Sequence, residues 1–146
     1  MGAREHFKIF PAVFIFLIKD NKVFLLRRFN TGWADGQLTA PSGHIEDGET
    51  PTVAAVRELR EESGTEVDPK DLKFMQVIYR KSDRTYSDFL FITEKWSGEP
   101  HNAEPDKADL AGWYDLDNLT ENTLPFIKKA FENYRVGEVY TEFGWN

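Results

Sequence analysis

An arginine and three glutamates lie close together in one short segment, at Arg57, Glu58, Glu61 and Glu62. In a helix, residues three and four positions apart are neighbours, so the three carboxylates would crowd one another there. A bound cation would relieve that repulsion, and clustered carboxylate oxygens are ligands that Mg²⁺ and Mn²⁺ prefer. Arg57 can orient the carboxylate of Glu61 through a charge-assisted hydrogen bond. A glutamate-rich run is also typical of a solvated helix face, so this spacing alone leaves both interpretations open.

The residues around this cluster extend it to a longer pattern, G-x5-E-x7-R-E-U-x-E-E-x-G-U, in which U is a bulky aliphatic residue. The fixed positions are filled by Gly43, Glu49, Arg57, Glu58, Glu61, Glu62 and Gly64. This pattern closely resembles the signature of the Nudix hydrolases, and the resemblance covers nearly the whole chain. Leu59 fills the first aliphatic position, but Thr65 stands at the second. Ser42 also replaces a glycine that is common in the family, so we expect Ser42 to need a backbone shape that glycine adopts more easily.

The resemblance implies a Mg²⁺-dependent enzyme, in which Mn²⁺ can substitute, that hydrolyses the diphosphate linkage of a nucleoside diphosphate joined to another group. It implies that Glu61 and Glu62 are metal ligands and that Gly43 adds a backbone carbonyl. Glu58 is implied to be either a further ligand or the general base. Arg57 is implied to hold a glutamate in place.

The general base of the reaction is not fixed by the motif, because in this family it also comes from a later loop. Glu104, Asp106 and Asp109 precede the predicted strand at Trp113 and are the candidates. Glu104 begins a segment, residues 104–107, that resembles a motif of several family members at this place. For any one of these acids, an ordinary exposed loop residue is the favoured interpretation.

Two arginines, Arg27 and Arg28, end a predicted strand that leads towards the motif. A guanidinium suits bidentate binding of phosphate, and in related enzymes an arginine near this place contacts substrate phosphate. Side chains alternate along a strand, so only one of the two can face the site, and we favour Arg28. Trp33 and His44 are further candidates for substrate contact.

Recognition of a base or sugar needs planar stacking partners. The aromatic candidates are Phe10, Trp33, Tyr79, Tyr86 and Phe89. In a chain with 12 Phe, most aromatic residues belong to the core, so each candidate has this second interpretation.

The elements that must position these residues follow from the hydrophobic patterns and the turn signals. Strands are expected at residues 7–18, 22–28, 37–40, 72–80, 85–96 and 110–114, with helices at 50–63 and 124–134. Thr50 can cap the first helix and Gly64 can end it, while Asp20 and Asn21 indicate a hairpin turn. We expect the small and apolar face of that helix to pack on the sheet; it holds Thr52, Ala55, Val56, Leu59 and Ser63. The order predicts an α/β fold, a Nudix-type α/β/α sandwich with a mixed β-sheet, formed by a single domain over residues 1–146.

Composition narrows the function further. The chain has 146 residues, 40% of them hydrophobic, a net charge of −7 and no cysteine. The absence of cysteine excludes a thiol nucleophile and a zinc–thiolate site, and acidity argues against binding long nucleic acids. With no signal peptide and no membrane span expected, we predict a cytoplasmic protein. The sequence does not decide whether the protein forms a homodimer. Residues 142–145 could cover a neighbouring subunit, cover the site mouth, or fray.

The substrate class is predicted from markers that some Nudix branches carry after the motif. The proline of the ADP-ribose branch is missing around Arg80, and the tyrosine of the dinucleoside polyphosphate branch is missing around Ser82. We therefore expect a pyrophosphohydrolase of a (d)NTP or a modified nucleotide. The alternatives are a catalytically silent Nudix-fold domain that binds nucleotides or regulates, and a hydrolase of ADP-ribose or of RNA 5′ ends.

Overall fold

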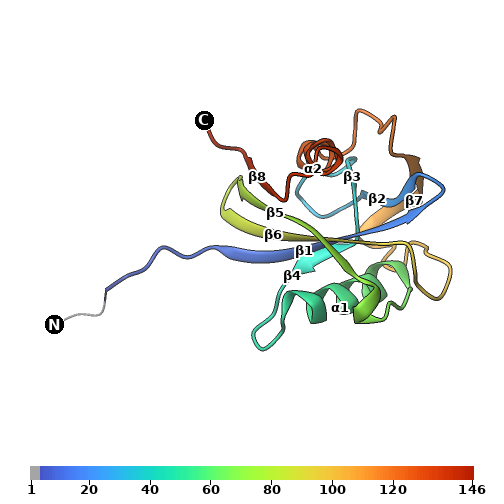
Figure 1. Cartoon of the computed structure of the whole chain (residues 1–146), viewed down its shortest axis with the longest axis horizontal. Coiled ribbons are helices and arrows are strands. Elements are labelled where there is room, and N and C mark those ends of the chain that lie inside the picture. The colour runs from blue at the N-terminus through green and yellow to red at the C-terminus, as the bar shows by residue number, and fades with distance from the viewer. Residues whose placement is uncertain (1–3) are drawn as a thin grey trace.

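The computed structural model describes residues 4–146, and its core is one mixed eight-stranded sheet between two helices (Figure 1). Helix α1 covers one face of the sheet and helix α2 covers the other, which confirms the predicted α/β/α sandwich. The strands are β1 (Phe10–Lys19), β2 (Lys22–Arg28), β3 (Leu38–Thr39), β4 (Ser42–His44), β5 (Lys73–Lys81), β6 (Thr85–Thr93), β7 (Ala108–Asp115) and β8 (Tyr140–Phe143). The helices are α1 (Pro51–Ser63), the short 3-10 helix η1 (Pro69–Asp71) and α2 (Pro125–Arg135).

Strand β1 organises the sheet, because it pairs with three other strands. It runs parallel to β6 over eight residue pairs, antiparallel to β4 near its start, and antiparallel to β2 at its end. The hairpin between β1 and β2 turns at Asp20 and Asn21, whose φ angles of 52° and 59° are positive, as a tight two-residue turn requires. The main strand order is β3-β2-β1-β6-β5-β8, with β7 on β2.

Alternating side chains on β1 supply both hydrophobic cores. Phe14 and Phe16 face α2, where their rings meet Phe126 and Phe131 at centroid distances of 5.4 and 4.8 Å. The residues between them on the strand, such as Ile15, face α1. Because β1 is buried on both faces, it reads in the sequence as a continuous apolar run.

Helix α1 begins and ends where its sequence predicts. The side chain of Thr50 accepts a hydrogen bond from the backbone N–H of Val53 at 3.2 Å. Gly64 ends the helix at φ 71°, a left-handed conformation that glycine adopts without steric cost. Thr65, the position that departs from the motif, is fully buried, and its hydroxyl lies 2.6 Å from that of Ser63.

Three local expectations were wrong. Strand β1 begins at Phe10 rather than at residue 7, and β4 lies within residues 41–48, where no strand was expected. Ser42 lies in β4 and is not among the residues with positive φ, so it needs no glycine-like backbone. For residues 142–145 fraying was one of the open alternatives, and this segment begins within β8, which pairs in parallel with β5. Within residues 4–146, no helix is both long and apolar enough to cross a bilayer.

Candidate active site

The backbone of β4 meets two glutamates of α1 directly. A Cβ atom added to Gly43 would overlap the carboxylate of Glu58, so only glycine allows this approach. The carboxylate of Glu62 accepts a hydrogen bond from the backbone N–H of Ser42 at 2.8 Å. Strand β4 is itself held on β1, where Gly43 pairs with Val13. The short strand that the sequence did not reveal therefore positions two of the motif glutamates.

Arg57 joins the loop before α1 to the helix. Its Nε and Nη2 donate to the two carboxylate oxygens of Glu49 at 2.7 and 2.8 Å, and its Nη1 donates to Glu58 at 2.7 Å. Its bond to Glu61, the partner expected from the helical spacing, is longer at 3.3 Å. The Arg57 guanidinium, together with a backbone bond at Glu46, holds the pKa of Glu49 at about 2. Arg57 thus holds the carboxylates of Glu49 and Glu58 through short hydrogen bonds and that of Glu61 only through a long one.

The donor set on α1 and β4 fits a divalent cation. Burial, together with the nearby carboxylates of Glu58 and Glu104, raises the pKa of Glu62 to about 8. Burial also raises the pKa of Glu58, against the effect of Arg57. The ionised forms of both carboxylates are therefore disfavoured without a counter-charge, and a hard cation at this place would stabilise them. Within residues 4–146, no three acidic or histidine side chains already converge at metal-ligand spacing, because the half-exposed side chain of Glu61 lies against Arg57.

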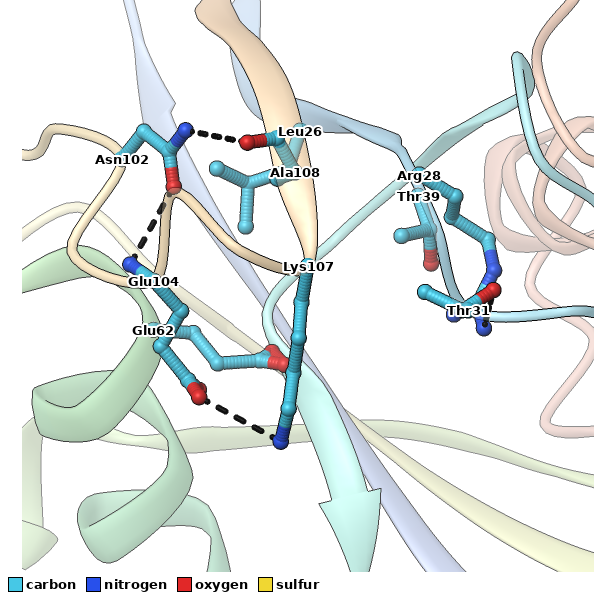
Figure 2. Close-up of a pocket in the computed structure, with 9 residues that line it drawn as sticks. All are labelled: Leu26, Arg28, Thr31, Thr39, Glu62, Asn102, Glu104, Lys107 and Ala108. Carbon is cyan, nitrogen blue, oxygen red and sulfur yellow. Dashed lines mark hydrogen bonds and ion pairs between the residues drawn. The ribbon is translucent and has the colours of Figure 1, made fainter.

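A first cavity, here called the inner cavity, opens beside Glu62 and has a volume of about 180 Å³. Figure 2 shows Glu62, Glu104 and Lys107 on one side of it and Arg28 with Thr31 on the other. Lys107 lies 3.4 Å from the carboxylate of Glu104. The inner cavity therefore has two acids on one wall and an arginine on the opposite wall.

A second, larger cavity of about 620 Å³, the outer cavity, continues from the first, because Arg28, Thr31 and Glu62 line both. Its remaining wall is formed by β4, by the loop that contains Trp33, and by the end of β5 and the start of β6. Its residues outside the inner cavity are Ala12, Gly32, Trp33, Ser42, Gly43, His44, Arg80, Ser82, Asp83, Arg84 and Tyr86.

Arg28 is oriented by the loop that follows its strand. Its Nε donates to the carbonyl of Trp33 at 2.7 Å, and its Nη2 donates to the hydroxyl of Thr31 at 2.9 Å. The loop is in turn held by Asp35, which accepts from the backbone N–H of Gly32 at 3.0 Å. The guanidinium also lies 4.8 Å from the centre of the Trp33 ring. Arg28 is thus fixed at the junction of the two cavities.

Only some of the other predicted substrate residues line a cavity. Trp33, His44 and Tyr86 line the outer cavity. The ring of Phe10 lies beside those of His44 and Tyr86, with centroid distances of 6.2 and 5.8 Å. Arg27 lies elsewhere, paired with Asp109 at 2.7 Å, whereas Arg28, the favoured one of the two arginines, lines both cavities.

Four further candidates line neither the inner nor the outer cavity. Tyr79 stacks on Trp145, with ring centroids 5.6 Å apart and planes only 4° from parallel. Phe89 packs against the core beneath α1. Asp109 is held by Arg27, and Asp106 lines neither cavity, which leaves Glu104 as the only later-loop candidate in the inner cavity.

Sequence reasoning missed several residues that line the cavities. Arg80 and Arg84 lie at the end of β5 and in the turn to β6, and Asn102 and Lys107 lie in the loop before β7. The one available signal was Lys107 within the motif-like segment 104–107, which was considered only for its acids. The arginines gave no signal, because pairing between β5, β6 and β1 brings them to the cavity.

Comparison with known proteins agrees with this geometry. A family model described as "NUDIX domain" matches residues 8–134. The chain is 34% identical over 119 residues to the 8-oxo-dGTP diphosphatase of Escherichia coli strain K12, covering 81% of this chain and 88% of that protein. It is 33% identical over 136 residues to the ADP-ribose pyrophosphatase of Methanocaldococcus jannaschii, covering 89% and 73%. The crystal structure of a MutT NUDIX hydrolase from Burkholderia pseudomallei superposes with a TM-score of 0.79 at 22% identity, covering 86% of this chain and 97% of that one.

Proposed function

The chain belongs to the Nudix hydrolase family and is thus a hydrolase of phosphorus anhydrides, and we propose that its substrate is a nucleoside triphosphate or a modified form of one, cleaved with Mg²⁺. The observation that carries this proposal is the pair of facing walls in the inner cavity, with Glu62 and Glu104 opposite Arg28. Phosphates have the charge to lie between an arginine on one side and cation-bearing carboxylates on the other.

The metal would be held by the carboxylates of Glu58, Glu61 and Glu62 and by the backbone carbonyl of Gly43. When bound, Mg²⁺ neutralises phosphate charge and lowers the pKa of a coordinated water. Arg57 keeps Glu58 next to Gly43, and the N–H of Ser42 orients Glu62. These contacts hold the donors in place before the substrate arrives, which lowers the cost of assembling the site.

The later-loop acid Glu104 is our candidate for the general base. It lies in the wall of the inner cavity beside Glu62, and its carboxylate is partly buried and paired with Lys107. From that position it can accept a proton from a water that attacks phosphorus. Glu58 remains the alternative base, as the motif itself allows.

The nucleoside is best accommodated on the side of Trp33. A third cavity of about 310 Å³, here called the side cavity, shares Trp33, Arg80 and Ser82 with the outer cavity. Its other walls include Gln37, Phe126 and Phe143. A phosphate chain on Arg28 would therefore place its base near an aromatic ring and a mainly apolar cavity, as base recognition requires.

The remaining expectations concern surroundings and partners. The net charge of −7 favours a small substrate bound through metal ions over a long nucleic acid. With no cysteine in the chain, folding needs no oxidising compartment, and we propose that the enzyme acts in the cytoplasm.

A product-identified hydrolysis screen tests the proposed function. The panel holds ordinary and oxidised (d)NTPs, ADP-ribose, dinucleoside polyphosphates and 5′-triphosphorylated RNA, each with Mg²⁺, Mn²⁺ or chelator. We expect metal-dependent cleavage of nucleoside triphosphates by the native protein and none by Glu62→Gln. Cleavage of ADP-ribose or RNA alone would move the substrate class to those alternatives. No cleavage of any compound would support the silent binding domain.

A further inference from the structure

Arg80, which the mechanism does not use, is a buried arginine with one uncommitted nitrogen. Only 5% of the residue is exposed. Its Nε and Nη2 donate to the two oxygens of Asp88 at 2.6 and 3.2 Å, and Asp88 is fully buried. No side chain or carbonyl within residues 4–146 accepts a hydrogen bond from its Nη1. Among residues 4–146 no fully buried side-chain nitrogen lacks a partner, so Nη1 is open to the cavities that Arg80 lines and can donate to a bound ligand there.

Aromatic rings hold the guanidinium of Arg80 in place. Its central carbon lies 4.3 Å from the centre of the Tyr86 ring and 4.5 Å from that of Phe126, with Trp33 farther away at 5.9 Å. With Asp88 on its edge and two rings against it, the group cannot readily turn towards another partner. The guanidinium of Arg80 can therefore donate a hydrogen bond to a ligand at only one fixed position.

Arg80 also lies in the walls of both the outer and the side cavity. The same two cavities share Trp33, on which Arg28 lies. A nucleotide whose phosphates bind Arg28 would therefore present its base to Arg80. This step rests on the proposed function, because it takes the occupant of the cavities to be a nucleotide.

The chemistry of the Arg80–Asp88 pair selects for an acceptor. Asp88 balances the charge of Arg80, so the pair offers hydrogen-bond donors in a mainly apolar wall rather than a net positive charge. A carbonyl oxygen of a base satisfies a donor of this kind. The amino group that adenine or cytosine carries at the same place is itself a donor. It would cover Nη1 without accepting its hydrogen bond, and leaving a covered donor unpaired costs binding free energy.

We propose that Arg80 is a specificity-determining residue, whose Nη1 donates a hydrogen bond to a ring carbonyl of the substrate base and so selects keto bases over amino bases. The bases selected are of the guanine, hypoxanthine and uracil class. Asp88 acts as a positioning residue, because it fixes the orientation of the guanidinium without reaching the cavities.

Equilibrium binding of nucleoside monophosphates, without metal, tests the proposal apart from catalysis. We expect the native protein to bind GMP and IMP at least tenfold more tightly than AMP, or UMP at least tenfold more tightly than CMP. IMP is the decisive ligand, because it differs from AMP at position 6 and carries no other amino group. Equal affinities within both the purine and the pyrimidine pair would overturn the proposal.

Two variants separate recognition from folding. The double variant Arg80→Met with Asp88→Leu removes both buried charges together, which avoids leaving either one unpaired. We expect it to bring the keto-to-amino ratio to within about threefold of unity. The matched variant Arg84→Met removes an arginine that lines the same outer cavity, and we expect it to weaken all nucleotides while the ratio stays unchanged.

The outcomes distinguish the two proposals. If the double variant folds and keeps the native ratio, the assignment of Arg80 is wrong. If the double variant does not fold, the IMP comparison in the native protein decides. If the native protein neither binds these nucleotides nor hydrolyses the triphosphates, the proposed function itself fails.

Discussion

Gly43 lies so close to Glu58 that a Cβ on the glycine would overlap the glutamate's carboxylate. We therefore expect Gly43→Ala to push Glu58 away from its bond with Arg57. The displaced carboxylate would leave its place beside Gly43, and misplacement by about 1 Å commonly lowers turnover about 100-fold. The measurement is kcat with a nucleoside triphosphate, together with the melting temperature.

Gly112 provides the control for that substitution. A Cβ at Gly112 would meet only the ring of Tyr114, at an ordinary 3.8 Å. Gly112→Ala should leave kcat within about twofold, because the added Cβ meets only this ordinary contact and displaces no neighbour. Equal losses in the two variants would mean that the effect comes from the strands and not from Glu58.

Glu62→Gln should lower turnover by orders of magnitude and leave the fold intact. Burial raises the pKa of Glu62 to about 8, so the ionised form gains little from the metal-free fold. The neutral amide should therefore keep the free energy of unfolding within about 1 kcal/mol. Glu66→Gln, at an exposed ion pair with Arg60, is the control and should keep native turnover. Near-native turnover of Glu62→Gln would contradict its role as a ligand.

The contact between Arg57 and Glu49 should be lost in acid. The pKa of Glu49 is lowered from 4.5 to about 2, so the folded state binds its proton less readily than the unfolded chain. The contribution of Glu49 to stability is therefore present above pH 4.5 and lost as pH falls towards 2. Glu49→Gln should flatten the stability curve over this window, as measured by denaturant titration at several pH values. A curve parallel to that of the native protein would show that Arg57 does not act through Glu49.

Local signals in the sequence predicted the parts of the site that depend on local structure. The cap at Thr50, the stop at Gly64 and the hairpin at Asp20 and Asn21 each involve neighbouring residues, so their chemistry is visible in a few letters. The face of α1 that carries Leu59 was predicted for the same reason, since the helical period fixes it.

Features that depend on distant pairing could not be predicted in this way. The approach of Gly43 to Glu58 depends on β4 pairing with β1, and a three-residue strand is too short to show a period. Arg80 reaches the cavities only because β5 pairs with β6, and it meets Asp88 across that pair. The C-terminal strand β8 holds a single buried residue, Thr141, and so gave no hydrophobic signal.

Leu59→Ala tests how α1 is anchored. Leu59 is fully buried in the core between α1 and the sheet, and truncation of such a leucine costs about 2–5 kcal/mol. Val53→Ala on the same helix is the control, because Val53 is 53% exposed and should cost less than about 1 kcal/mol. Both values come from chemical denaturation. Similar costs for the two variants would mean that the helix is oriented differently.

Trp33→Ala should separate base binding from phosphate binding. Stacking of a base on an aromatic ring is worth about 1–3 kcal/mol by alanine substitution, so KM should rise roughly tenfold to a hundredfold while kcat changes less. Tripolyphosphate has no base, so its inhibition constant should change less than KM. Trp145→Ala is the control, since Trp145 stacks on Tyr79 and donates to its carbonyl at 3.1 Å, away from the inner and outer cavities. If tripolyphosphate and nucleotide weaken equally, Trp33 acts by holding Arg28, whose guanidinium lies 4.8 Å from its ring centre, rather than by stacking on the base.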